Sequence, residues 1–181
     1  GMFDLVETLF GIRIRATAGR EVWHQDVGYF EVTDAQGLRG GFYVDLYARQ
    51  RKRGGAWMDD CVGRARLAGQ LDHPVAFLVC NFMPATGDRP ALLTHDEVVT
   101  LFHEFGHTLH HLLTRVDYPS VAGINGVAWD AVELPSQFME NFAWQAEVLP
   151  SISGHYETGE PLPADLLQRL LSSRNFQSGM Q

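Results

Sequence analysis

The chain has 181 residues, of which 45% are hydrophobic and 20% are charged, a composition typical of one globular domain rather than of a disordered or fibrous chain. Its 22 acidic residues outnumber its 14 Lys and Arg, giving a formal net charge of −8, which argues against nucleic acid and anionic membranes as partners. Cys61 and Cys80 are too few for a disulfide scaffold, so we expect a cytoplasmic protein.

The first half of the chain, from about residue 10 to residue 90, is predicted to be rich in strands. Residues 29–32 and 38–47 carry short alternations of apolar and polar side chains around a polar turn segment, which is typical of a β-hairpin. Gly37 is expected to supply the positive φ that closes this turn. Residues 51–57, which contain two adjacent glycines, are interpreted as a solvated connection.

Residues 74–82 (PVAFLVCNF) form the longest apolar stretch, and Pro74 and Pro84 bound it. Its length and composition favour a buried strand. The stretch is less than half of the ~20 residues that a membrane-spanning helix requires. Because no basic, apolar, cleavable segment opens the chain either, the sequence indicates neither membrane insertion nor secretion.

A helix is predicted to begin after Thr94. Thr94 and Glu97 match the capping box, in which each side chain bonds the backbone N–H of the other residue. Apolar residues then recur at a helical period as far as about Arg115. The apolar positions are Val98, Val99, Leu101, Phe102, Phe105, Leu109, Leu112 and Leu113.

A loop containing Pro119, Gly123 and Gly126 is expected to follow this helix. A second helix is predicted from near Trp129, through Pro135 in its early turns, to about Glu147. Its inner face is expected to carry Val132, Phe138, Phe142 and Trp144. A further amphipathic helix is predicted at residues 163–177.

The first of these helices contains an HExxH motif, running from His103 to His107. Two residues at i and i+4 project from nearly the same face of a helix, about 6 Å apart along its axis, so both imidazoles can bind one zinc ion. Glu104 is rotated by about 100° from His103 and can contact a reacting water without being a ligand. The motif therefore predicts a metal site within a capped helix.

A catalytic zinc ion takes three protein ligands and keeps one position open. The candidates for the third ligand are His110, His111, Asp117, Asp130, Glu133, Glu140 and Glu147. A ligand from a separate helix closes a tetrahedron more easily than a residue further along the same helix. Glu133 and Glu140 lie two turns apart on one face of the second predicted helix, and the spacing alone leaves both open.

Several segments together resemble the thimet-oligopeptidase family of zinc metallopeptidases, and the resemblance extends from about Trp23 to the end of the chain. These segments are residues 95–98 (HDEV), 102–107 (FHEFGH) and 132–137 (VELPSQ), followed by Glu140, Asn141 and Trp144. The second glutamate block and its separation from the HExxH motif make the match more specific than the motif alone.

The resemblance implies that His103, His107 and Glu133 bind zinc and that Glu104 is the general base of peptide-bond hydrolysis. The substrates it implies are short oligopeptides. Metal-bound imidazoles usually donate their second N–H to a carboxylate or a carbonyl group. Asp130 and Glu140 are the candidates for that supporting role.

The expected fold is a single α+β domain of the zincin type over residues 1–181. A small antiparallel sheet in residues 10–90 is predicted to pack against metal-binding helices in residues 94–181. By analogy with other zincins, the strand at residues 77–82 is expected to offer its edge to a peptide substrate. The loop at residues 121–127 is expected to move beside the substrate or to be a plain connection.

The ends of the chain suggest a piece of a larger, mostly helical peptidase. Gly1 in front of Met2 is interpreted as the remnant of a purification tag. In the resembling family, the His and Tyr groups that stabilise the oxyanion lie in a later portion, so we expect these residues alone to be nearly inactive. We also expect self-association through uncovered apolar faces. The alternative is a peptide-binding or scaffold domain that retains a zinc site without turnover.

Overall fold

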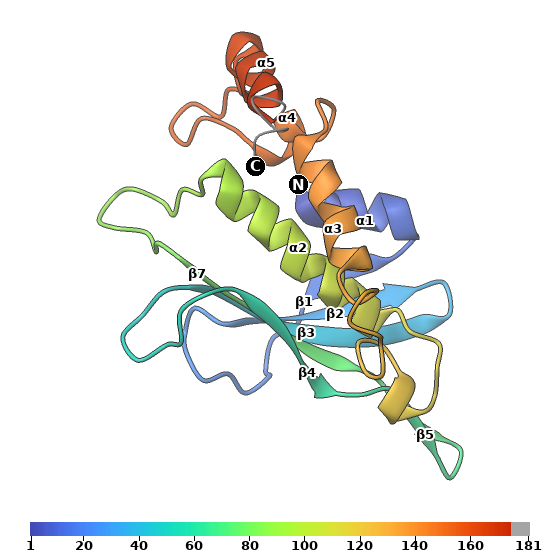
Figure 1. Cartoon of the computed structure of the whole chain (residues 1–181). Coiled ribbons are helices and arrows are strands. Elements are labelled where there is room, and N and C mark those ends of the chain that lie inside the picture. The colour runs from blue at the N-terminus through green and yellow to red at the C-terminus, as the bar shows by residue number, and fades with distance from the viewer. Residues whose placement is uncertain (175–181) are drawn as a thin grey trace.

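A five-stranded β-sheet with one long helix across one of its faces forms the centre of the molecule (Figure 1). The computed structural model describes residues 1–174. The strands are β1 (Arg13–Ala16), β2 (Gly28–Asp34), β3 (Gly37–Tyr47), β4 (Trp57–Val62), β5 (Ala65–Leu67), β6 (Gln70–Asp72) and β7 (Val75–Phe82). The helices are α1 (Met2–Phe10), α2 (His95–Leu112), α3 (Leu134–Glu140), α4 (Leu149–Ile152) and α5 (Ala164–Ser173), with 3-10 turns η1 (Pro119–Val121) and η2 (Asn141–Trp144).

The predicted hairpin is confirmed as the antiparallel pair β2 and β3. Gly37 is the first residue of β3 and has a φ of 112°, a backbone angle that residues other than glycine rarely adopt. The strand order in the sheet is β1-β2-β3-β7-β4, and β5 and β6 form a separate hairpin that projects from the body (Figure 1).

The sheet is mixed, so the prediction of a purely antiparallel sheet was wrong. β3 and β7 run parallel, because the chain leaves the end of β3, forms β4 and the β5–β6 hairpin, and returns before β7 begins. The predicted strand at residues 74–82 is present as β7, but it lies between β3 and β4 rather than at an edge. The edge beside β7 belongs to β4, which begins at Trp57, where the connection was expected to end.

Helix α2 begins as the capping box predicts, with Thr94 and Glu97 bonding each other's backbone N–H. It ends at Leu112, three residues before the predicted end. Its apolar face packs on the sheet, where Phe102 and Phe105 join Phe42 and Leu78 in one buried cluster. Helix α1, which was not predicted, completes this core with Val6, whose side chain is fully buried.

The predicted helix at residues 129–147 is broken into shorter elements. Helix α3 begins only at Leu134, because Pro135 lacks an N–H and is tolerated only in a first turn. The chain then passes into η2, and α4 follows. The buried side chains are Ser136, Met139 and Ala143, whereas the expected inner face comprised Val132, Phe138, Phe142 and Trp144. Phe138 is instead 52% exposed.

The last predicted helix is present as α5, and residues 175–177 of that prediction lie outside the described part of the chain. Between residues 1 and 174, no helix is both long enough and apolar enough to cross a membrane.

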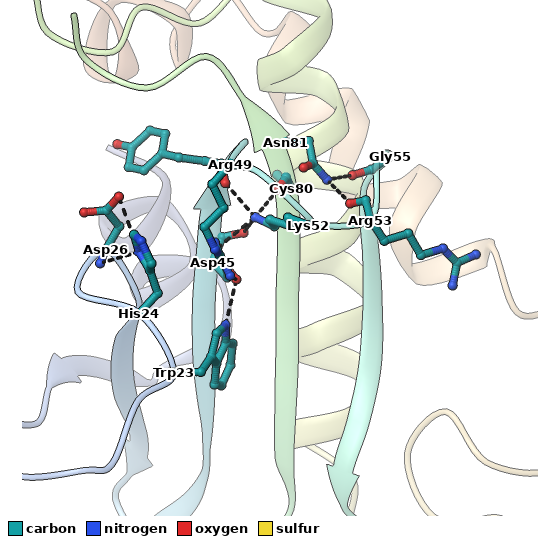
Figure 2. A network of polar contacts seen from close by, with 11 residues as sticks. Trp23, His24, Asp26, Asp45, Arg49, Lys52, Arg53, Gly55, Cys80 and Asn81 are labelled. Atoms are coloured by element: carbon teal, nitrogen blue, oxygen red, sulfur yellow. Dashed lines mark hydrogen bonds and ion pairs between the residues drawn. The ribbon is translucent and has the colours of Figure 1, made fainter.

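A buried ion cluster joins β3 to β7 on the sheet face away from α2 (Figure 2). Asp45 is 2% exposed and accepts two hydrogen bonds from Arg49, at 2.6 and 2.7 Å, and one from Trp23 Nε1 at 3.0 Å. The Nζ atom of Lys52 lies 2.8 Å from Asp45 Oδ1. It also lies within hydrogen-bond distance of the carbonyl oxygens of Asp45, Tyr47 and Cys80. The ammonium group therefore bridges the ends of the two parallel strands.

Burial raises the pKa of Asp45, but the hydrogen bonds from Arg49, Lys52 and Trp23 outweigh it and hold the pKa at about 2. Since this is below the ordinary value of 3.8, the ionised carboxylate stabilises the folded state above about pH 4 and this contribution is lost as the pH falls towards 2. The shift corresponds to roughly 2 kcal/mol.

We predict that Asp45→Asn lowers the free energy of unfolding at neutral pH by roughly 3 kcal/mol, because it leaves two cations beside a neutral amide. Urea unfolding at several pH values checks this, and the gap to the wild type should narrow as the pH falls below about 4. Asp88→Asn, at an exposed position without hydrogen bonds among the described residues, is the control. A gap that is small at neutral pH or independent of pH would contradict the prediction.

Candidate metal centre

Two imidazoles project from one side of α2, one turn apart. The ring centroids of His103 and His107 are 5.0 Å apart. The Nε2 atoms of both rings face the same oxygen of Glu133, at 3.2 Å from His103 and 3.1 Å from His107. The three ligand atoms lie within 4.8 Å of one another. The structure therefore brings together the three residues that were predicted to form a metal site.

Glu133 reaches the histidines because α3 approaches α2 very closely at Gly106. A Cβ atom at Gly106 would lie 2.6 Å from the carbonyl oxygen of Pro135 and 2.6 Å from the Cα of Ser136. Contacts this short are sterically forbidden, so only glycine permits the observed helix spacing. The glycine inside the HExxH motif thus sets the distance between the histidines and the glutamate.

Glu140, at the end of α3, supports the first histidine. Its Oε1 atom lies 2.6 Å from Nδ1 of His103. A carboxylate can only accept, so Nδ1 is the donor in this contact and Nε2 is the ring atom that faces Glu133. Burial lowers the pKa of His107, which also favours the neutral ring that binds metals.

Asp130, the other candidate for a supporting role, is exposed and makes no hydrogen bond or ion pair with either imidazole. The Nδ1 atom of His107 is buried without a partner among the described residues.

The remaining candidate ligands lie elsewhere. Nε2 of His111 donates a hydrogen bond to the carbonyl oxygen of Val62 at 3.0 Å, and Asp117 forms ion pairs with two arginines. His110 and Glu147 are outside the cluster that the described residues form.

Glu133 is held in place by Ser136, a residue that the sequence analysis did not single out. The hydroxyl of Ser136 lies 2.8 Å from Oε2 of Glu133 and 2.9 Å from its backbone carbonyl oxygen. The hydrogen bond from Ser136 is the main cause of a lowered pKa at Glu133, which keeps the carboxylate ionised. The only signal in the sequence was the i, i+3 spacing of the two residues.

Glu104 lies on the buried side of α2 and is only 9% exposed. Burial raises its pKa above the ordinary value, while the charge of His103 and a backbone hydrogen bond from Met58 act in the opposite direction. Because Met58 belongs to β4, this contact places the carboxyl group between the metal-binding helix and the edge strand of the sheet.

A cysteine nucleophile is not available beside this carboxylate. Cys80 is fully buried, and burial raises its pKa to about 12. The thiol is therefore protonated at neutral pH, and thiolate chemistry requires the opposite shift.

Comparisons with known proteins agree on one family. A family model described as peptidase family M3 matches residues 1–181. The chain is 59% identical over 182 residues to oligopeptidase A of Haemophilus influenzae and 58% identical over 182 residues to oligopeptidase A of Escherichia coli. Each match covers 99% of this chain and 27% of the relative.

A dipeptidyl carboxypeptidase of Escherichia coli is 39% identical over 182 residues, which is 100% of this chain and 26% of that protein. The chain thus spans about a quarter of the length of these relatives.

We predict that Gly106→Ala separates α3 from α2 and lowers the free energy of unfolding by roughly 1–3 kcal/mol. Alanine favours an isolated helix by about 1 kcal/mol over glycine, so a loss of stability can come only from the helix contact. Chemical denaturation measures the change. Gly54→Ala is the control, because a Cβ there meets no atom within 4 Å. Equal or greater stability of Gly106→Ala would contradict the proposed contact.

Proposed function

Because this chain belongs to peptidase family M3, we propose that it contributes the catalytic zinc site of an endopeptidase that hydrolyses short peptides. In this proposal His103, His107 and Glu133 hold the zinc ion and Glu104 is the general base. We also propose that the fold is zincin-like, with the HExxH helix lying on a β-sheet.

The convergence of three ligand atoms on one point carries the proposal. Two neutral imidazoles and one carboxylate are a donor set that catalytic zinc sites use, with one position left open. The hydrogen bond between Nδ1 of His103 and Glu140 supports the fit, because it orients the ring with Nε2 facing Glu133. A zinc ion held by these three residues would supply a Lewis acid and would lower the pKa of a water molecule to about 7.

The chain's own residues provide the proton transfer. Glu104 follows His103 directly but projects at about 100° to it, so it can reach the attacking water without occupying a ligand position. Its carboxylate accepts the proton of that water and returns it to the departing amine. No covalent bond to the protein is required.

A peptide is proposed to lie beside β4. Among the described strands, β4 pairs only with β7, so no described strand covers its other edge. An extended peptide that adds to this edge would pass close to Glu104, since Met58 of β4 already contacts that carboxyl group. The names of the oligopeptidase A relatives support short peptides as substrates.

We predict that the wild-type chain binds one zinc ion and that Glu104→Gln binds it equally well, because Glu104 is not a ligand. In an intact family member that carries the same motif, the matching substitution should lower the hydrolysis of a fluorogenic peptide by roughly 10²- to 10⁴-fold. An intact protein suits the rate measurement because we expect the 181 residues alone to be slow.

Elemental analysis after dialysis gives the zinc content, and His107→Ala is the control that should lose it. Zinc binding without any hydrolysis in the intact protein would favour the alternative, a peptide-binding or scaffold domain. Absence of zinc binding by the wild type would overturn the proposal itself.

The 181-residue chain is also proposed to self-associate. Large apolar side chains are exposed on the described part of the chain, with Trp129 at 93% and Leu134 and Tyr118 each at 73%. Exposed apolar groups of this size favour association. We predict that the sedimentation coefficient rises with protein concentration and that Trp129→Lys reduces this rise. A single monomeric species at all concentrations would contradict the prediction.

A further inference from the structure

The carboxylate of Glu133 has few restraints of its own. Its side chain is 47% exposed, and the residue precedes the first turn of α3 rather than lying within the helix. The segment before it, from residue 122 to residue 133, consists of turns and irregular backbone. A glutamate side chain has three rotatable bonds, so a ligand at such a position loses rotamer entropy each time it binds a metal.

Ser136 is fixed far more firmly than Glu133. Its side chain is fully buried, and its Cα packs directly against α2, where Gly106 leaves no room for a Cβ atom. The hydroxyl is therefore held on the rigid contact between the two helices. From there it lies 2.8 Å from Oε2 of Glu133, the oxygen that faces both imidazoles.

We propose that Ser136 is a positioning residue that holds the Glu133 carboxylate in its ligand geometry before the metal arrives; this inference rests on the proposed zinc site. The hydroxyl donates its hydrogen to Oε2 and contacts no imidazole. Because the carboxylate is preorganised, less entropy is lost on binding, and zinc affinity is higher than Glu133 alone would give.

Ser136 and Glu140 act on different ligands. Glu140 orients His103 through its Nδ1 atom, whereas Ser136 orients the carboxylate through Oε2. The two supports share α3, and the close contact at Gly106 places both against α2. Loss of Ser136 should therefore weaken metal binding while leaving the contact between His103 and Glu140 unchanged.

The test compares zinc affinities, measured by competition with a chromophoric chelator, for the wild-type chain, Ser136→Ala, Ser136→Thr and Ser151→Ala. Ser136→Ala should weaken zinc binding by roughly 10- to 100-fold. Ser136→Thr keeps a hydroxyl and should recover most of the affinity. Ser151 is the matched control, because its hydroxyl also bonds the carbonyl oxygen three residues earlier, that of Val148, but contacts no predicted ligand.

Unfolding of the zinc-free proteins separates positioning from folding. Ser136→Ala and Ser151→Ala each remove one hydroxyl hydrogen bond, and the loss of stability should be on the order of 1 kcal/mol at the buried Ser136 and no larger at the exposed Ser151. Only Ser136→Ala should also lose zinc affinity. Affinity within twofold of the wild type for Ser136→Ala would overturn the inference and leave the zinc site intact. Failure of the wild type to bind zinc would overturn the proposed function instead.

Discussion

The close approach of α3 to α2 is the contact on which the candidate site depends. Glu133 and the two histidines come from different elements, so their mutual distance is decided by how near the second helix can come to the first. A side chain at Gly106 would meet backbone atoms of α3 at 2.6 Å. Glycine permits that approach, the approach fixes Ser136, and Ser136 contacts the carboxylate that faces both imidazoles. One residue without a side chain thus determines the geometry of four others.

The packing of the opposite face of α2 explains why the two histidines are held rigidly. Phe102 and Phe105 anchor the helix in the core shared with β3 and β7, so the histidines project from a helix that cannot rotate without breaking that packing. Glu104 lies towards the buried side and contacts the backbone of β4. The sheet therefore supports the imidazoles and also surrounds the carboxyl group with low-dielectric protein, which raises its pKa. The packing of α2 on the sheet thus accounts both for the fixed position of the histidines and for the raised pKa of Glu104.

Local sequence signals predicted α2 and the β2–β3 hairpin. The capping box of Thr94 predicted the start of α2, the helical period brought His103 and His107 to one face, and Gly37 predicted the hairpin turn. Strand β4 was missed because its residues from Asp59 to Val62 are exposed, so it lacks the apolar alternation of a half-buried strand. The parallel pairing of β3 and β7 and the contact at Gly106 join segments far apart in sequence, and no local pattern encodes them. The family resemblance, rather than spacing, chose Glu133 over Glu140.

The ammonium group of Lys52 has a consequence for the whole sheet. Adjacent antiparallel strands can be locked in register by a tight turn, but β3 and β7 run parallel and have no short link between them. Lys52 contacts carbonyl oxygens at the ends of both strands, together with the buried Asp45 carboxylate. The ammonium group therefore links two parallel strands that no short turn connects. Because side chains of β7 pack against α2 on the opposite face, a shift of β7 along β3 would also disturb the packing beneath the metal-binding helix.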